Sequence, residues 1–203
     1  MPNSPSSLSP ASGTKGGTVL IGGDQAGGHD PARKLVAAAV ATAQTTTVAS
    51  GAVISADGTA GDGGAVIVWS ELQTDYAGAI SARGAGAGNG GAAETSSHGV
   101  LKFTGTVDLT SANAKTGTLL LDPLNLVISN GVTSGAGSAP DFVAGNAASV
   151  LNNSDLQTAL STANITVTAS GSIGVTQTVT WTSGHSLTLD AGTTLTIGGS
   201  GSN

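Results

Sequence analysis

The sequence contains no cysteine and few aromatic or charged residues. Of its 203 residues, 9% are charged and 2% are aromatic. Without cysteine the chain can form neither disulfides nor thiolate metal sites, which by itself does not place it in the cytosol. The six basic residues are scattered and the formal net charge is −6. No basic stripe is available to neutralise phosphates, so we expect no nucleic-acid partner.

Long apolar runs are also missing. No stretch approaches the roughly 20 residues that a helix needs to cross a bilayer, and we expect no membrane insertion. Residues 1–12 are rich in proline and serine and lack the charged and apolar regions of a signal peptide. They are predicted to form a disordered linker or leader.

What the chain has instead is a repeated phrase: two small residues, a short β-branched or aliphatic run, then glycine or a turn. It occurs at 16–23, 63–69 and 115–122, with a weaker copy at 90–95. The last three copies start roughly 26 residues apart, a period typical of stacked supersecondary units. The weaker copy, Ala92-Ala93-Glu94-Thr95, is expected to belong to the most loosely packed coil.

Short β-rich runs separated by Gly, Asp, Asn and Ser clusters favour a sandwich, a barrel or a β-helix, and hairpin signals are largely lacking. At about 20–25 residues per coil, a β-helix of this length would have about eight coils. Strands are predicted at 18–21, 45–48, 52–55, 65–69, 77–81, 100–103, 107–109, 118–121, 124–128, 165–168, 174–181, 186–189 and 193–197.

Two segments interrupt the strand pattern. At 30–41, a helix starting from Asp30 and Pro31 competes with an irregular excursion. At 154–161 we predict a short helix, capped by Ser154 with Gln157 completing a capping box. The chain is thus divided into the leader (1–12), β-helix coils (13–130), a Gly/Ala/Ser-rich loop (131–153), and a short helix followed by further β-helix coils (154–203).

Seven ordered segments together resemble the filamentous-haemagglutinin-like exoproteins of bacterial two-partner secretion: Gly16–Asp24, Ala43–Val48, Ile54–Asp57, Gly61–Ser70, Ile80–Gly84, Gly117–Pro123 and Leu156–Thr168. The resemblance implies an all-β, right-handed parallel β-helix solenoid with one or two short helical or loop excursions. It also implies secretion through an outer-membrane two-partner secretion transporter, and display at the bacterial cell surface or release as an adhesin.

The family's N-terminal secretion domain, with its Asn-Pro-Asn motifs, is not found. The resemblance therefore implies an internal or C-terminal fragment of a longer passenger. A host-cell receptor or glycan would be the ligand. The loops at 26–42 and 130–153 are predicted to contact it, because they break the coil rhythm.

The sequence predicts no metal, cofactor or catalytic residues. His29, His98 and His185 are far apart, whereas a zinc site needs three or four converging ligands. Asp57 and Asp62 flank glycines without a repeated calcium motif, so we assign them to turns. Five further aspartates stand singly, mostly near strand ends: Asp24, Asp75, Asp108, Asp122 and Asp190.

Two alternatives remain open. Parallel β-helices include polysaccharide-active enzymes, which need clustered carboxylates. Threonine ladders bind ice or crystal surfaces, and Thr-x-Thr pairs occur at 166–168 and 194–196. Aromatic side chains could stack on sugars, although Trp69 and Phe103 are expected at the core or its edge. The aromatic residues are Trp69, Tyr76, Phe103, Phe142 and Trp181.

Overall fold

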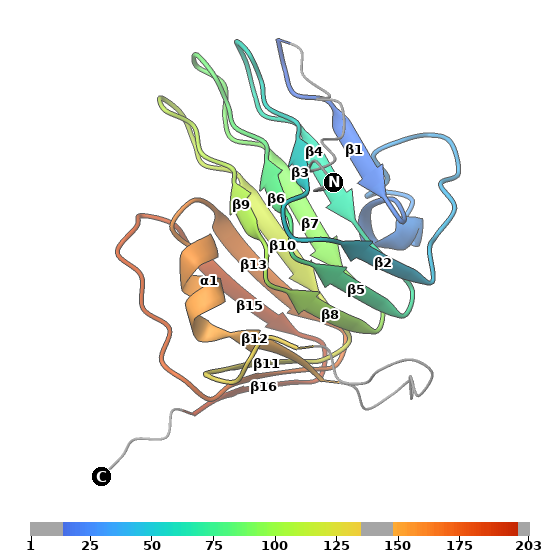
Figure 1. Cartoon of the computed structure of the whole chain (residues 1–203), viewed down its shortest axis with the longest axis vertical. Helices are drawn as coiled ribbons and strands as arrows, with labels where there is room; N and C mark the ends of the chain where they lie inside the picture. Colours follow the sequence, from blue (N-terminus) through green and yellow to red (C-terminus); the bar gives the residue numbers. More distant parts are fainter. Residues whose placement is uncertain (1–13, 135–147, 199–203) are drawn as a thin grey trace, which may run out of the picture.

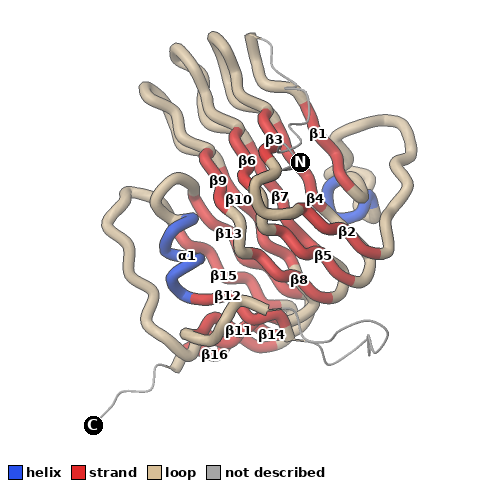
Figure 2. The backbone as a smooth tube through the Cα atoms, in the orientation of Figure 1, coloured by secondary structure: helices blue, strands red, loops and turns tan. Residues whose placement is uncertain are grey.

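The computed structural model describes residues 14–134 and 148–198 and shows a parallel β-helix (Figures 1 and 2). Its main sheet has six strands, and each strand pairs in parallel with the equivalent strand of the next coil. These strands are β1 (Thr18–Ile21), β4 (Ala65–Val68), β7 (Ala92–Ser96), β10 (Thr118–Asp122), β13 (Asn164–Ala169) and β15 (Leu187–Ala191). The predicted fold class is confirmed, with six strands stacked in the main sheet rather than the eight coils expected.

Three smaller parallel sheets complete the coils. One contains β2 (Thr45–Val48), β5 (Gln73–Tyr76) and β8 (Val100–Phe103). Another contains β3 (Val53–Ser55), β6 (Ala79–Ser81) and β9 (Thr106–Asp108). The third runs in the order β12 (Ser149–Asn152), β11 (Leu126–Ser129), β14 (Ser172–Val175) and β16 (Thr194–Ile197). No helix in the described part of the chain is long and apolar enough to span a membrane.

The repeated phrase marks the main sheet. Thr18, Ala65, Ala92 and Thr118 align on neighbouring strands, and the central coils follow the period of roughly 26 residues. The weaker copy is fully integrated, contrary to expectation: Ala93 is 3% exposed, and β7 lies between β4 and β10. The small Ala93 side chain is accommodated because its partners in register are the larger Val66 and Leu119.

Glycines at the start of the main-sheet strands allow the coils to approach closely. The N–H groups of Gly64, Gly91 and Gly117 donate to the carbonyl oxygens of Ala56, Ala82 and Leu109 at 2.7, 2.7 and 2.8 Å. A Cβ atom on any of these three glycines would lie within 2.2 Å of a glycine carbonyl oxygen in the preceding coil. Only glycine leaves that space free. We call Gly64, Gly91 and Gly117 the glycine ladder.

Beyond the last ladder glycine, the side chain of Asn164 links the coils by hydrogen bonds. Its side-chain Nδ2 donates to the carbonyl oxygens of Thr116 and Gly117 at 3.0 and 3.1 Å, and its Oδ1 accepts from the Ser186 N–H at 3.0 Å. One amide side chain therefore connects three successive coils. Both of its polar ends are satisfied, as a partly buried amide requires.

Three loops that precede β4, β7 and β10 project together from one edge of the solenoid (Figure 1). They span residues 57–63, 83–90 and 110–116, and we call them the stacked loops. Backbone bonds link neighbours: the Ala85 N–H donates to Gly61 at 2.9 Å, and the Gly84 N–H donates to Thr110 at 3.0 Å. The coil repeat thus continues beyond the strands.

The segment at 30–41 forms no helix in the structure. A 3-10 turn, η1 (Gln25–Gly28), precedes it, and one turn begins where the Arg33 N–H donates to the Asp30 carbonyl at 3.0 Å. The next N–H groups, those of Leu35 and Val36, donate instead to the Asp24 carboxylate. A helix cannot continue because its backbone donors are already engaged.

The second predicted helix is present as α1 (Asn153–Ala159), but its cap was assigned wrongly. Asn152 is the N-cap, since its Oδ1 accepts from the Ser154 N–H at 2.8 Å. Gln157 makes no capping box, because its Oε1 accepts from the Thr180 N–H at 2.8 Å. The cap therefore lies two residues earlier than predicted.

Several strand assignments also differ from prediction. β5 and β7 are absent from the predicted strands, and β12 lies inside the segment assigned to a loop at 131–153. The strand predicted at 174–181 ends at Val175 in β14. Thr176 still donates its N–H to the Ile128 carbonyl of β11 at 2.9 Å, but the residues after it bond to α1: the Asn153 Nδ2 donates to the Thr178 carbonyl at 2.9 Å. The leader at 1–12 and residues 135–147 lie outside the described residues.

Replacing Gly91 by alanine should lower the free energy of unfolding by about 3 kcal/mol. The added methyl group would overlap backbone atoms, and a change of side-chain rotamer cannot relieve that overlap. Gly174→Ala is the matched control. Gly174 also lies in a strand, but its Cβ would be 3.9 Å from the nearest atom, on Val127. The control should be unchanged or about 0.5 kcal/mol more stable. Chemical denaturation measures both, and equal effects would contradict this role for the ladder.

Candidate functional site

The longest excursion in the first half of the chain is clamped to the outside of the main sheet. It comprises residues 24–43, which we call the outer loop. Its ends are close together, since the Ala43 N–H donates to the Gly22 carbonyl at 2.8 Å. Inside it, the Asp24 carboxylate accepts from the N–H groups of Gln25 and Leu35 at 2.7 and 3.0 Å. A single buried carboxylate therefore organises the loop.

The outer loop covers side chains that would otherwise face solvent. Residues alternate along β4 and β7, so Ile67, Trp69 and Glu94 point away from the core. They are nevertheless only 2%, 3% and 1% exposed. A Cβ atom on Gly27, whose φ is +66°, would lie 2.5 Å from the Trp69 ring. Only glycine allows the loop to turn and to lie this close to the indole.

Glu94 ties the outer loop to the sheet. Its two carboxylate oxygens lie 3.1 and 3.4 Å from the Ala26 N–H, which donates to them. Ala26 itself has φ of +49°, which is uncommon for a residue with a side chain. The buried acid thus holds a turn that the chain would not readily adopt alone.

Two histidines and Glu71 lie at the rim of a small pocket beside this covered face. His29 Nε2 and His98 Nδ1 are each 3.6 Å from a Glu71 carboxylate oxygen. The His29 ring meets the Trp69 ring edge-on, with 5.7 Å between centroids. We call this the rim pocket; its lining includes His29, Trp69, Ser97, His98, Asp122 and Ser170.

Burial sets the electrostatics of the acids beneath and beside the rim pocket. It raises the pKa of Glu94, although the Ala26 N–H and Arg33 act in the opposite direction. Burial likewise raises the pKa of Asp122, against the influence of Thr168, Arg33 and His98. For Asp24, burial is outweighed by three backbone N–H groups and Lys34, so its pKa is lowered. The covered face therefore holds two acids that resist ionisation.

The histidine cluster was missed by sequence reasoning, which treated the three histidines as separate. His98 follows Glu71 by one coil repeat, and the His98 N–H donates to the Ser70 carbonyl at 3.0 Å. That spacing was the available signal. His185 lies elsewhere, with Nδ1 2.8 Å from the Leu160 carbonyl oxygen. Among the described residues, no three His, Asp or Glu side chains are placed to hold a metal ion.

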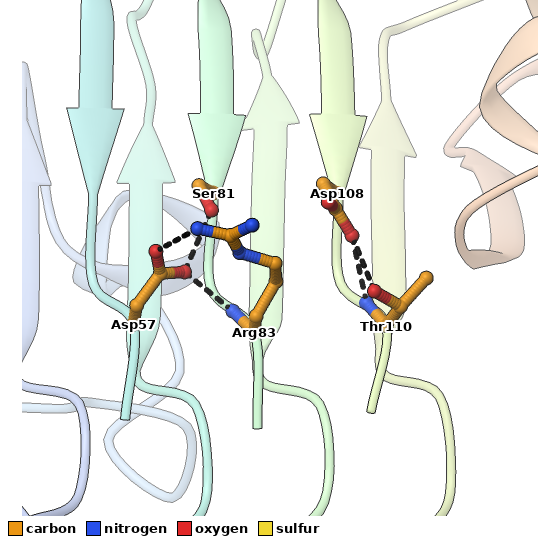
Figure 3. A network of polar contacts seen from close by, with 5 residues as sticks. All are labelled: Asp57, Ser81, Arg83, Asp108 and Thr110. Atoms are coloured by element: carbon orange, nitrogen blue, oxygen red, sulfur yellow. Dashed lines mark hydrogen bonds and ion pairs between the residues drawn. The ribbon is translucent and has the colours of Figure 1, made fainter. Parts of the chain in front are cut away.

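Asp57 acts as a tie between coils at the base of the stacked loops (Figure 3). Its carboxylate accepts from the Ser81 hydroxyl at 2.6 Å, from the Arg83 N–H at 2.7 Å and from the Arg83 guanidinium at 2.9 Å. In the next coil Asp108 accepts from the backbone N–H and the hydroxyl of Thr110. Burial raises the pKa of Asp57, but the hydrogen bonds from Arg83 and Ser81 have the larger effect, so the pKa is lowered overall.

Other acids have similar partners. Asp62 lies 3.0 Å from Lys15 Nζ, and Asp75 lies 3.1 Å from Lys102 Nζ. In both pairs the two residues belong to neighbouring coils or their loops. These carboxylates are engaged locally and are not gathered at one site.

The aromatic residues divide into covered and exposed ones. Tyr76 and Phe103 stack inside the core with ring centroids 5.6 Å apart, and Trp69 is covered by the outer loop. Trp181 is 38% exposed. Phe142 lies outside the described residues. The expectation of a place in the core or at its edge is therefore confirmed for Phe103, whereas Trp69 is buried on the outer face of the main sheet.

The described ends of the second predicted loop close on themselves. The backbones of Ser134 and Val150 exchange antiparallel bonds of 3.0 and 2.8 Å. The Thr133 hydroxyl donates to Asp155 at 2.5 Å and accepts from the Asn152 N–H at 2.8 Å.

The threonine pairs do not build a common row, since Thr166 aligns with Thr188 while Thr168 aligns with Asp190.

No known family model matches this chain, and no curated protein matches it either.

Acids whose pKa is raised by folding, such as Glu94, and acids whose pKa is lowered, such as Asp57, predict opposite pH dependences of the unfolding free energy. Because the pKa of Glu94 is raised by folding, its contribution to stability is present below the ordinary pKa of 4.5 and is lost as pH rises through the raised value. Glu94→Gln should therefore flatten the decline in unfolding free energy as pH rises above 4.5. Urea denaturation across this range provides the measurement.

Asp57→Asn is the control for that experiment. The lowered pKa of Asp57 gives stability that is present above its ordinary value of 3.8 and is lost as pH falls through the folded value. The substitution should reduce the acid-induced loss of stability below pH 3.8 and leave the decline above pH 4.5 unchanged. A wild-type slope in Glu94→Gln would show that Glu94 does not titrate as described.

Proposed function

We propose that this chain is a non-catalytic, adhesive segment of a large secreted bacterial surface protein of the filamentous-haemagglutinin-like type. In this proposal an outer-membrane two-partner secretion transporter carries the protein to the cell exterior. The segment then binds host or neighbouring-cell surfaces, or their glycans. The observation that carries the proposal is the outer loop, which is fixed to a rigid solenoid while residues 29–35 remain exposed.

A loop held in one conformation suits binding. Asp24 engages the loop's backbone, and Glu94 fixes it to β7. A partner that contacts such a loop orders few additional residues, so less conformational entropy opposes association. We call residues 29–39 the exposed crest, since all of them except the half-buried Val36 are exposed. The crest offers the basic side chains of Arg33 and Lys34 next to Leu35, which is 39% exposed.

The carboxylates support a mechanical role. Asp57, Asp62 and Asp75 each pair with a base that lies roughly one coil away along the solenoid. Such surface pairs contribute modestly one by one, but their repetition along the rod joins coil to coil. A rigid rod that presents a fixed loop can display a binding surface at a distance from its anchor.

A polysaccharide-active enzyme is the second candidate, and the rim pocket is the observation that favours it. Asp122, whose pKa is raised, lines this pocket together with His98. Carboxyl groups that lie in clefts and have a shifted pKa are candidates for acid–base catalysis. Incubation with a polysaccharide panel distinguishes the two functions, because new reducing ends or unsaturated products would establish turnover, and their appearance would overturn the non-catalytic proposal.

The adhesive proposal predicts that changing the exposed crest weakens surface binding. The double substitution Leu35→Ser with Ala38→Glu alters exposed side chains and leaves the Asp24 and Glu94 bonds to backbone in place. We expect binding of the purified protein to cultured epithelial cells to fall about tenfold, which corresponds to the loss of one good contact. Flow cytometry with labelled protein measures this.

The matched control is Val53→Ser with Ala112→Glu, because Val53 is 45% exposed but lies away from the outer loop on β3. It should bind like the wild type, and both variants should keep the wild-type circular dichroism spectrum. Equal binding by all three proteins would remove the outer loop as the contact surface.

A further inference from the structure

The segment from 177 to 185 leaves the coil and lies against α1 (Figure 1). It begins after Thr176, whose N–H donates to the Ile128 carbonyl of β11, and ends before Ser186, whose carbonyl accepts from the Ile165 N–H of β13. Two side chains one helical turn apart hold it there. Asn153 Nδ2 donates to the Thr178 carbonyl at 2.9 Å, and Gln157 Oε1 accepts from the Thr180 N–H at 2.8 Å. The segment is therefore fixed by the helix surface rather than by strand pairing.

Trp181 lies on this segment with a fixed, exposed indole ring. Its Nε1–H donates to the His185 carbonyl at 2.8 Å, and His185 Nδ1 lies 2.8 Å from the Leu160 carbonyl oxygen. Apolar side chains, including Val179 and Leu187, line a hollow next to the indole. With 38% of the residue exposed, the ring is available to a ligand and oriented before the ligand arrives.

A second hollow beside the indole is polar and uncharged. Among the described residues, its lining side chains other than Trp181 carry only hydroxyl or amide groups: Gln157, Ser161, Thr180, Thr182 and Ser183. Gln157 uses its oxygen to hold the Thr180 N–H, which orients its amide nitrogen as a donor. The Ser183 hydroxyl donates to the Leu160 carbonyl at 2.5 Å, so its oxygen can still accept.

We infer that Trp181 and the adjoining polar hollow form a binding site for a neutral pyranose sugar. The apolar C–H face of a pyranose ring packs on an indole face, while its hydroxyl groups exchange hydrogen bonds with amides and hydroxyls at the edge. A uronic or sialic acid would bring a carboxylate for which this hollow supplies no base. The site names a ligand class for the proposed binding function and rests on that function.

Trp69 provides an internal reference for this site. It is the second tryptophan of the chain, and it is 3% exposed beneath the outer loop. In protein labelled with 15N at the indole nitrogens, Trp181→Phe assigns the two indole resonances. The probes are neutral oligosaccharides containing gluco-, galacto- and manno-configured pyranoses, with sialyllactose and a heparin-derived disaccharide as charged controls.

We expect at least one neutral oligosaccharide to shift the Trp181 indole resonance saturably and to leave that of Trp69 in place. By isothermal titration calorimetry, Trp181→Ala should weaken this binding by about tenfold or more, whereas Trp181→Phe should retain part of it. Gln157→Ala should weaken it less. Leu195→Ser, which changes another exposed apolar residue in this part of the chain, should bind like the wild type.

The inference is overturned if no neutral sugar shifts the Trp181 resonance, if only the charged controls bind, or if Trp181→Ala binds as tightly as the wild type in a folded protein. Its failure is separable from that of the proposed function. Cell binding that depends on the outer loop, without any sugar response at Trp181, removes the sugar site alone. A sugar response without cell binding by the wild type removes the adhesive function and keeps the site.

Discussion

The close approach of backbone to backbone at the glycine ladder is the constraint on which the coil stack depends. Each ladder N–H bonds to the residue that directly follows β3, β6 or β9 in its own coil. The absence of a Cβ atom at each ladder glycine leaves room for the backbone of the coil before it. One residue type thereby satisfies two requirements, the bend of the chain and the distance between coils. The bonds that follow the ladder, from the Ala92 N–H to the Gly64 carbonyl at 2.9 Å and from the Thr118 N–H to the Gly91 carbonyl at 3.2 Å, join successive coils in the register in which Val66, Ala93 and Leu119 meet inside.

This regular frame makes the outer loop informative. A parallel β-helix satisfies its strands between coils, so its outer face does not need a cover. Here β4 and β7 are covered, and the cover depends on two buried acids, Asp24 and Glu94, and on Ala26, whose positive φ is strained for a residue with a side chain. Local strain that the surroundings maintain is more often associated with function than with packing. The proposed adhesive surface lies on this loop.

The repeat and its β character could be predicted because glycine pairs and β-branched runs recur along the chain. Polar strands were missed: β5 reads Gln-Thr-Asp-Tyr, and only its position one coil before β8 indicates pairing. The weak copy at β7 was misjudged because the sequence shows the small size of Ala93 but not its neighbours. In the structure the larger Val66 and Leu119 lie beside it in register and fill the core. The helix considered at 30–41 does not form for a different reason: the Asp24 carboxylate accepts from the Leu35 and Val36 N–H groups, which a helix would need.

The candidate sites were less predictable than the fold. His29, Glu71 and His98 come from a loop and from two coils, so their proximity depends on a register that the sequence shows only after the repeat is aligned. The polar hollow at Trp181 depends on Gln157 of α1, which was assigned to a capping box. In both cases long-range placement, rather than residue type, brings the groups together.

Amide hydrogen exchange under native conditions tests the central claim most directly. The Gly91 N–H, bonded to the Ala82 carbonyl, and the Gly88 N–H, bonded to the Ala85 carbonyl, are only three residues apart, with Gly88 inside a stacked loop and Gly91 directly after it. If the ladder holds the coils together, Gly91 should exchange only on global unfolding, together with Gly64 and Gly117, whereas Gly88 should exchange through local opening. Exchange of Gly91 as fast as that of Gly88 would contradict the account.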